Sequence, residues 1–328
     1  MFNIFLNNRI LLVFVLPFFL GCSSVFSFQP YNFTVINFFI FPILFFIICN
    51  INKRSKNKYR KKPHLINLFY VGYFFGVGFF LTGTYWISNS LQFDDLFRNF
   101  IPLTIIILPL VLGLFYGLGL LLCSKFLKND FVSILLFCAT ISLIDYSRAK
   151  ILTGFPWNLW GYSWSWFNEG IQILNPIGLF AFNLLVITFY CTLSILFIKK
   201  LKYKNLILII FTLIFFSNYL YGNYVINNNN IKNEKLFENN KTINIKIISP
   251  NFELKYNLSE KETYERVKKL IRYSNIEKDK KTLFIWPEGA LSGKYLFEIE
   301  KYKDLFKENF SSEHLIIFGI NTLNKKDN

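Results

Sequence analysis

Histidine and cysteine are scarce in this sequence, and neither is arranged as a metal site. The two histidines of the 328-residue chain, His64 and His314, are too few and too far apart to predict a metal centre. All the cysteines lie inside apolar runs, so we expect no disulfide framework, no zinc site and no other cofactor. They are Cys22, Cys49, Cys123, Cys138 and Cys191.

Acidic residues are also few: 20 Asp and Glu stand against 36 Lys and Arg, which gives a net charge of +16. An excess of this size can indicate nucleic-acid binding. Here the basic residues cluster in short gaps between apolar runs, which argues against nucleic acid as a partner. The chain is 53% hydrophobic and 20% aromatic. A single soluble domain is excluded, and a polytopic membrane protein is predicted.

Seven apolar segments are long enough to cross about 30 Å of hydrocarbon. We expect them to form an α-helical membrane domain over residues 1–222. In the first of them, Leu20-Gly21-Cys22-Ser23-Ser24 is similar to a lipoprotein signal peptide, but further spans follow at once, so Cys22 is expected inside a helix. The segments are residues 10–28, 33–51, 66–88, 101–123, 131–147, 176–198 and 205–222.

The basic residues between these segments are distributed unevenly. The loops after the second, fourth and sixth segments hold 13 Lys and Arg, whereas the loops after the third and fifth hold 3. Positive residues favour the cytoplasmic side. The N-terminus is therefore predicted in the cytoplasm, and everything that follows seven spans is predicted on the opposite side of the membrane.

The composition changes after residue 222. Residues 223–241 are rich in Asn and Lys and predict a polar linker. Residues 242–328 alternate between strand and helix patterns, which predicts a parallel sheet with crossover helices. Ser259 is a candidate N-cap with Glu262 as its capping-box partner. The expected strands are residues 242–248, 282–286 and 315–318, and the expected helices are residues 259–276 and 295–310.

The second of these strands leads into Trp286-Pro287-Glu288. Proline cannot donate to a sheet ladder, so the strand should end at Pro287. Glu288 is then expected just past the carboxyl end of a strand, where ligands bind in open α/β sheets. A carboxylate on an apolar rim can serve as a general base. The alternative is an ordinary solvated glutamate in a turn.

A second unusual stretch is Leu152-Thr153-Gly154-Phe155-Pro156-Trp157-Asn158-Leu159-Trp160-Gly161-Tyr162-Ser163. Its Trp and Tyr residues suit the aromatic belt at a membrane interface. The alternative is a loop at headgroup depth that admits a lipid to a site above it. Just before it, Asp145 and Arg148 have the i,i+3 spacing of an ion pair on one helix face, and ionisable residues near a span are often functional.

Together these motifs resemble the apolipoprotein N-acyltransferases, which are integral-membrane members of the nitrilase superfamily. The resemblance covers nearly the whole chain and keeps the order of the motifs. It is carried by Phe28-Gln29-Pro30-Tyr31, Gly76-Val77-Gly78-Phe79-Phe80, Trp86, Thr153-Gly154-Phe155-Pro156-Trp157, Gly161-Tyr162-Ser163, Asn175-Pro176-Ile177-Gly178, Ile248-Ser249-Pro250-Asn251 and Ile285-Trp286-Pro287-Glu288.

The resemblance implies a periplasmic αββα nitrilase-like domain on a multi-pass protein of the bacterial inner membrane. It implies that a Glu-Lys-Cys triad takes an acyl chain from a phospholipid donor and transfers it to the α-amine of a diacylglyceryl-cysteine on a lipoprotein acceptor. Glu288 matches the catalytic Glu of the family. The residues implied in substrate binding are Gly154, Phe155, Pro156, Trp157, Tyr162 and Tyr256.

The sequence also departs from the family pattern. The family's Lys and Cys follow the third strand, and no Cys follows Cys191 here, so we interpret residues 242–328 as the incomplete first part of that domain and expect this chain alone to be inactive. Gly289 stands where the family often has Ser or Thr. The alternatives are another membrane-tethered nitrilase-like amidase or acyltransferase, and a non-catalytic polytopic scaffold. Against a transporter, no pair of spans shows Gly/Pro-broken half-helices with buried charges.

Overall fold

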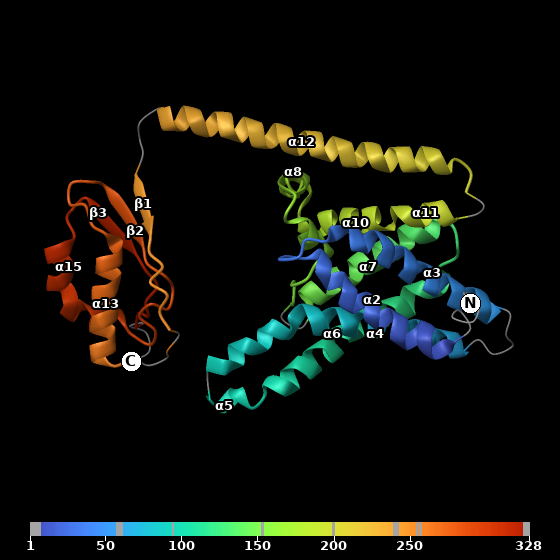
Figure 1. The fold of residues 1–328 in the computed structure, drawn as a ribbon, viewed down its shortest axis with the longest axis horizontal. Coiled ribbons are helices and arrows are strands. Elements are labelled where there is room, and N and C mark those ends of the chain that lie inside the picture. The colour runs from blue at the N-terminus through green and yellow to red at the C-terminus, as the bar shows by residue number, and fades with distance from the viewer. Residues whose placement is uncertain are drawn as a thin grey trace. The chain divides into compact units, whose positions relative to one another are not determined.

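The computed structural model describes residues 8–56, 62–93, 95–151, 154–198, 201–238, 243–253, 255 and 258–323. The chain divides into two compact units, Met1–Asn230 and Ile231–Asn328. Figure 1 shows that the first unit is built of helices and the second combines helices with a small sheet.

Within the described residues, the structure contains six helices that are long and apolar enough to span a membrane. They correspond to the last six predicted segments, which confirms a multi-pass membrane protein. The first predicted segment forms a shorter apolar helix, Leu11–Ser27, so the count of seven depends on it. The six helices are Thr34–Lys53, Leu65–Gln92, Ile101–Phe126, Phe131–Lys150, Leu179–Phe197 and Lys204–Leu236.

Several of these spans consist of α-helix joined to short 3-10 or π turns. The elements of the chain up to Glu238 are η1 (Leu11–Val15), α2 (Leu16–Ser24), η2 (Val25–Ser27), η3 (Thr34–Ile36), α3 (Asn37–Lys56), α4 (Lys62–Thr84), η4 (Tyr85–Phe93), α5 (Asp95–Arg98), α6 (Ile101–Cys123), η5 (Ser124–Phe126), α7 (Phe131–Lys150), η6 (Trp160–Trp164), α8 (Asn168–Ile171), α9 (Leu174–Ile177), α10 (Leu179–Tyr190), η7 (Cys191–Leu193), α11 (Ser194–Phe197) and α12 (Lys204–Glu238).

Helix α4 packs against both α2 and α6. Glycines allow this close approach: a Cβ at Gly78 would overlap the carbonyl oxygen of Phe18, and a Cβ at Gly72 would overlap that of Tyr116. Apolar burial does not drive helices together inside lipid, so small residues that admit close backbone packing are enriched at such interfaces. The glycines of α4 therefore join the N-terminal helix to the rest of the unit.

Helix α12 extends further than the sequence suggested. A polar linker was predicted from residue 223, but the Asn-rich residues continue the helix to Glu238, and the Asn227 amide donates to Asn223 Oδ1 at 3.2 Å. Residues 239–242 lie outside the described residues. Near its middle the helix packs on α8, where Asn218 Nδ2 donates to the carbonyl oxygen of Gly170 at 3.0 Å.

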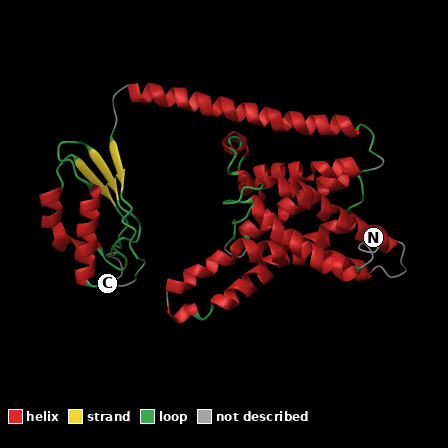
Figure 2. Cartoon of the chain, in the orientation of Figure 1, coloured by secondary structure: helices red, strands yellow, loops and turns green. Residues whose placement is uncertain are grey.

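The second unit contains a three-stranded parallel sheet in the order β1-β2-β3 (Figure 2). The register aligns Ile245, Leu283 and Leu315. This confirms the predicted parallel sheet, with strand ends within two residues of those expected. The elements are β1 (Asn244–Ile247), α13 (Glu260–Ser274), β2 (Thr282–Ile285), α14 (Leu296–Ile299), η8 (Glu300–Tyr302), α15 (Lys303–Asn309) and β3 (His314–Ile317).

Of the two helices predicted in this unit, the first is confirmed and the second is interrupted. Helix α13 begins with the expected capping box, in which Glu262 N donates to Ser259 Oγ and Ser259 N donates to Glu262 Oε2. The helix predicted over residues 295–310 is instead α14 and α15, separated by the 3-10 turn η8. A 3-10 turn places residues i and i+3 on one side, which lets Ile299, Tyr302 and Leu305 all pack on the core.

Candidate functional site

Glu288 lies just past the carboxyl end of β2, the central strand, as predicted. Trp286 N donates to Ile317 O and Ile248 N donates to Ile285 O, both at 2.9 Å, so pairing continues one residue beyond the strand. The ladder then ends at Pro287, which has no N–H to donate. The Glu288 side chain is exposed at the carboxyl edge of the sheet, the edge at which parallel α/β sheets bind ligands.

The backbone on either side of Glu288 is held in place. The indole of Trp286 is buried and donates to Ser274 Oγ at 3.1 Å. After the glutamate, Gly289 adopts a φ of 73°, which favours glycine. Glu288 also lies over the segment that follows β3, because a Cβ at Gly319 would be 3.7 Å from Glu288 Cγ. The carboxylate is thus presented to solvent from a fixed turn.

An arginine from helix α13 ties together the segments that follow β1 and β2. Arg266 Nη2 donates to Glu253 O at 2.6 Å, and its Nη1 donates to Ala290 O at 3.1 Å. Its guanidinium also lies 4.7 Å from the ring centre of Phe252. The Arg266 side chain therefore holds together the backbone segments at the carboxyl edge of the sheet, beside Glu288.

The other predicted site is a segment we call the aromatic loop, residues 154–164. The expected ion pair at its start is present: Arg148 Nη2 lies 3.3 Å from Asp145 Oδ1, and both side chains are fully buried. Arg148 Nη1 donates to the carbonyl oxygens of Phe155 at 2.6 Å and Trp157 at 2.7 Å. The pair therefore clamps the backbone of the loop to the end of α7.

The ion pair belongs to a larger buried network. Asp145 accepts from Tyr116 of α6 at 3.0 Å and from Asn183 of α10 at 2.9 Å. Trp160 Nε1 donates to the Tyr116 hydroxyl at 3.1 Å, and Gly161 N donates to Asn183 Oδ1 at 2.9 Å. Three helices and the loop thus share one set of hydrogen bonds, in which Arg148 Nε is the buried atom without a partner among the groups named here.

The aromatic loop has a buried half and an exposed half. Trp160 is fully buried, and its ring stacks 4.5 Å from that of Phe79. Trp157 is 51% exposed and contacts Trp86 of η4, with ring centres 5.5 Å apart. Tyr162 is partly exposed, and desolvation raises its pKa although the positive charge of Arg148 opposes this. Exposed Trp and Tyr beside apolar spans suit a membrane interface.

Gly154 opens the described part of the loop with a φ of 83°, and a Cβ there would overlap the carbonyl oxygen of Ala149. Only glycine fits this turn without strain. The predicted residues Gly154, Phe155, Pro156, Trp157 and Tyr162 lie in this one loop. Glu288 belongs to the other compact unit. Tyr256, Leu152 and Thr153 lie outside the described residues.

Sequence reasoning missed Tyr116 and Asn183, which complete the network around Asp145. The signal was present, because an amide inside the apolar run 176–198 needs a polar partner within the membrane. The sequence does not show which residue is the partner of Asn183, because residues 116, 145 and 183 come together only through helix packing. Among the described residues, no group of three or more His, Cys, Asp or Glu side chains is placed to hold a metal ion.

Comparison with known proteins agrees with this architecture. The sequence profile of the apolipoprotein N-acyltransferase N-terminal domain matches residues 20–192. The chain is 30% identical to the apolipoprotein N-acyltransferase of Rhodopseudomonas palustris over 177 residues, 54% of this chain and 32% of that protein. It is 29% identical to that of Rickettsia bellii over 260 residues, 78% of this chain and 50% of the relative. It is 37% identical to that of Rickettsia prowazekii over 139 residues, 42% and 28% respectively.

The helices and the buried network define a multi-pass membrane protein that carries a small α/β unit. The profile match covers more than half of the chain, and the chain belongs to the apolipoprotein N-acyltransferase family. It spans between about a quarter and a half of the length of the relatives named above.

Proposed function

We propose that this chain provides the membrane domain and the first part of the outer domain of an apolipoprotein N-acyltransferase. The reaction moves an acyl chain from a phospholipid to the α-amine of an N-terminal diacylglyceryl-cysteine on a lipoprotein. Family membership supports the reaction class. The observation that carries the assignment of a site is the exposed carboxylate of Glu288, held at the carboxyl edge of a parallel sheet.

The proposed domains are a membrane domain over residues 1–222, a connection over residues 223–241 and an outer domain over residues 242–328. The proposed count of seven spans includes the short helix Leu11–Ser27. Basic residues are concentrated in alternate loops, 13 against 3. This asymmetry supports a cytoplasmic N-terminus and a periplasmic outer domain in the bacterial inner membrane.

The open face of the sheet supports a nitrilase-like αββα sandwich. Helices α13 and α15 cover one face, where Phe284 is fully buried. On the other face, Ile245, Ile247, Leu315 and Ile317 are between 56% and 76% exposed. Parallel sheets are normally covered on both faces. A second sheet packed on these aliphatic residues would complete the sandwich.

In the proposed mechanism, Glu288 is the general base. It takes the proton of a cysteine thiol, and the thiolate attacks the ester carbonyl of the phospholipid. The lysophospholipid alkoxide leaves with that proton, and the acyl group remains as a thioester. The α-amine of the acceptor then attacks the thioester and regenerates the thiol. A Lys and backbone N–H donors stabilise the oxyanion in both steps.

The thiol and the Lys of this triad are not assigned to residues of this chain. Cys22, Cys49, Cys123, Cys138 and Cys191 all lie in apolar helices of the membrane unit. We therefore propose that residues 1–328 alone do not transfer acyl groups. Acyl transfer by the purified 328-residue chain to a diacylglyceryl lipopeptide, detected by mass spectrometry, would contradict this.

The test of the assignment uses a full-length reading frame that contains this chain and encodes the Lys and the Cys. Glu288→Gln removes the base and keeps the shape of the side chain. General base catalysis contributes about 10²- to 10⁴-fold, so acylation of a lipopeptide should fall by at least about 10²-fold. Glu300→Gln is the matched control, because Glu300 is exposed on η8 of the same unit and its loss should leave the rate unchanged.

Membrane insertion and protein level are measured in parallel for both variants. A Glu288→Gln protein that inserts normally and still acylates at the wild-type rate would refute the role of Glu288. Another group would then be the base. A wild-type protein that inserts normally and does not acylate would instead favour the alternative of a non-catalytic polytopic scaffold.

A further inference from the structure

The membrane unit contains a large apolar groove that the proposed reaction does not use. Its volume is about 1220 Å³, and its walls come from the N-terminal helix, from α3 and from the η7–α11 segment. The lining side chains include Leu12, Leu16, Ile43, Ile47, Leu196 and Phe197. Ile43 is 41% exposed and Phe197 is 63% exposed, so the groove opens sideways, toward the lipid that surrounds such spans.

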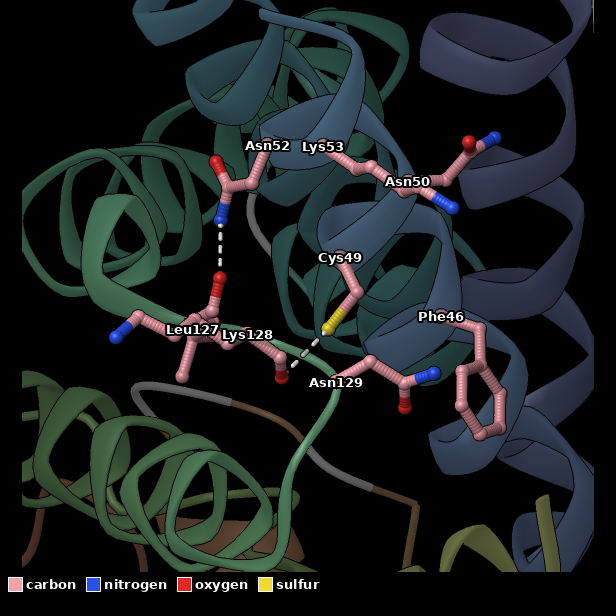
Figure 3. Close-up of a pocket in the computed structure, with 8 residues that line it drawn as sticks. All are labelled: Phe46, Cys49, Asn50, Asn52, Lys53, Leu127, Lys128 and Asn129. Atoms are coloured by element: carbon pink, nitrogen blue, oxygen red, sulfur yellow. Dashed lines mark hydrogen bonds between the residues drawn. The ribbon is translucent and has the colours of Figure 1, made fainter. Parts of the chain in front are cut away.

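One end of the groove becomes polar. A second cavity of about 420 Å³ shares Phe46, Asn50 and Asn129 with the groove. This second cavity, which we call the mouth, is also lined by Lys53 and Lys128 (Figure 3). The groove is therefore apolar along its length and polar at the end formed by amide and ammonium groups. A phospholipid has the matching polarity, with acyl chains at one end and a charged phosphate at the other.

The mouth is built on a fixed frame. Cys49 Sγ donates to Lys128 O at 3.2 Å, and Asn52 Nδ2 donates to the carbonyl oxygens of Ser124 at 2.6 Å and Leu127 at 2.9 Å. These bonds hold the end of α3 against the segment that joins α6 to α7. Figure 3 shows Asn50 and Lys53 extending from another side of α3 than Cys49 and Asn52 do.

Asn50 supplies the observation that points to a ligand. Its Nδ2 atom is one of several buried side-chain atoms of the described residues that have no hydrogen-bond partner, and the only one of them whose residue lines both cavities. An amide donor in this state costs free energy unless an acceptor reaches it. Asn50 lines both cavities, and it lies about one helical turn before Lys53 on α3. An acceptor that also carries negative charge would satisfy the amide and pair with the ammonium group.

The mouth lies far from the aromatic loop. That loop contacts the beginning of the same span, where Thr34 Oγ1 donates to Ser163 O at 3.0 Å. Asn50 lies 16 residues further along a continuous helical segment, which corresponds to about 24 Å at 1.5 Å per residue. The two places are therefore near opposite ends of the span Thr34–Lys53, and the mouth is separate from the aromatic loop.

We propose that the groove and the mouth bind an anionic phospholipid of the leaflet that faces Lys53. Its acyl chains fill the apolar groove, the Asn50 amide donates to a phosphate oxygen, and the charge of Lys53 favours an anionic headgroup over a zwitterionic one. This lipid is a bound structural ligand and takes no part in the chemistry assigned to Glu288.

The test measures lipid binding to the full purified chain by native mass spectrometry. The probes are dioleoyl phosphatidylglycerol, which is anionic, and dioleoyl phosphatidylcholine, which is zwitterionic. Wild type is expected to retain phosphatidylglycerol preferentially. Lys53→Gln should reduce that preference about fivefold, since one lysine at a membrane surface contributes about 1 kcal/mol and tenfold corresponds to 1.4 kcal/mol.

Two further variants separate the parts of the site. Asn50→Leu should weaken the binding of both lipids to a similar extent, because both carry a phosphate. Ile43→Trp should weaken retention of both lipids by narrowing the groove. Lys202→Gln is the matched control, since Lys202 is an exposed lysine outside both cavities, and its loss should change the preference clearly less than the loss of Lys53 does. Circular dichroism confirms the fold of each variant.

Three results would each overturn the proposal. If wild type retains both lipids equally, the groove holds only unspecific surrounding lipid. If Lys53→Gln and Lys202→Gln change the preference equally, or Asn50→Leu changes nothing, the mouth does not recognise the phosphate.

Discussion

Replacing Arg148 tests whether the buried ion pair holds the aromatic loop. Arg148→Gln would leave the Asp145 carboxylate buried without its countercharge and would remove the donor of two loop carbonyls. Removing one partner of a buried pair costs about 3–5 kcal/mol. At about 2–4 °C per kcal/mol for a unit of this size, the unfolding midpoint should fall by roughly 6–20 °C.

The assay is thermal unfolding of the purified chain in lipid nanodiscs, followed by tryptophan fluorescence. Lys150→Gln is the matched control: it removes one positive charge two residues away, where the side chain is exposed. Asp145→Asn combined with Arg148→Gln should recover part of the loss, because no unpaired charge then remains. If Arg148→Gln shifts the midpoint no more than Lys150→Gln does, the clamp contributes nothing and this reasoning is wrong.

Three further outcomes are expected. Gly154→Ala should lower the unfolding midpoint, since its φ of 83° and the Ala149 carbonyl leave no room for a Cβ; an unchanged midpoint would contradict this. Gly78→Val should separate α4 from the N-terminal helix, because its Cβ would overlap Phe18 O, and cysteine cross-linking between these helices should fail. The Lys255 and Ser259 contacts lower the pKa of Glu262 from its ordinary value to about 2. The resulting stabilisation of α13 is present above the ordinary pKa of about 4.5 and is lost as the pH falls through about 2. Hydrogen exchange in the first turn of α13 should therefore differ between wild type and Glu262→Gln near pH 6, and should converge near pH 2.

The sequence predicted best those features that local chemistry decides. Pro287 ended the central strand where expected, and the capping box of Ser259 marked the start of α13. The i,i+3 spacing of Asp145 and Arg148 was enough to predict their ion pair. Each of these depends on residues close together in the chain.

Features that depend on distant contacts were not predicted. Tyr116 and Asn183 reach Asp145 only because α6 and α10 pack beside α7. The turn η8 interrupts a predicted helix because Ile299, Tyr302 and Leu305 must face one core. Local composition carries no information on these packing requirements. The linker predicted over residues 223–241 is a different case, because residues 229–236 are exposed and still continue α12; no distant contact among the described residues explains this part of the helix.

The ion pair also has a consequence for how the chain enters the membrane. Helix α7 is the least apolar of the six long helices, with a mean hydropathy of 1.5, and it carries the buried residues Asp145 and Arg148 near its C-terminal end, where a buried charge without a partner opposes insertion. Because Asp145 lies on the same helix face, α7 can be released from the translocon as a nearly neutral segment. Tyr116 on α6, which is made earlier, already offers the carboxylate a partner. We expect α7 to leave the translocon together with α6 and to insert poorly without it.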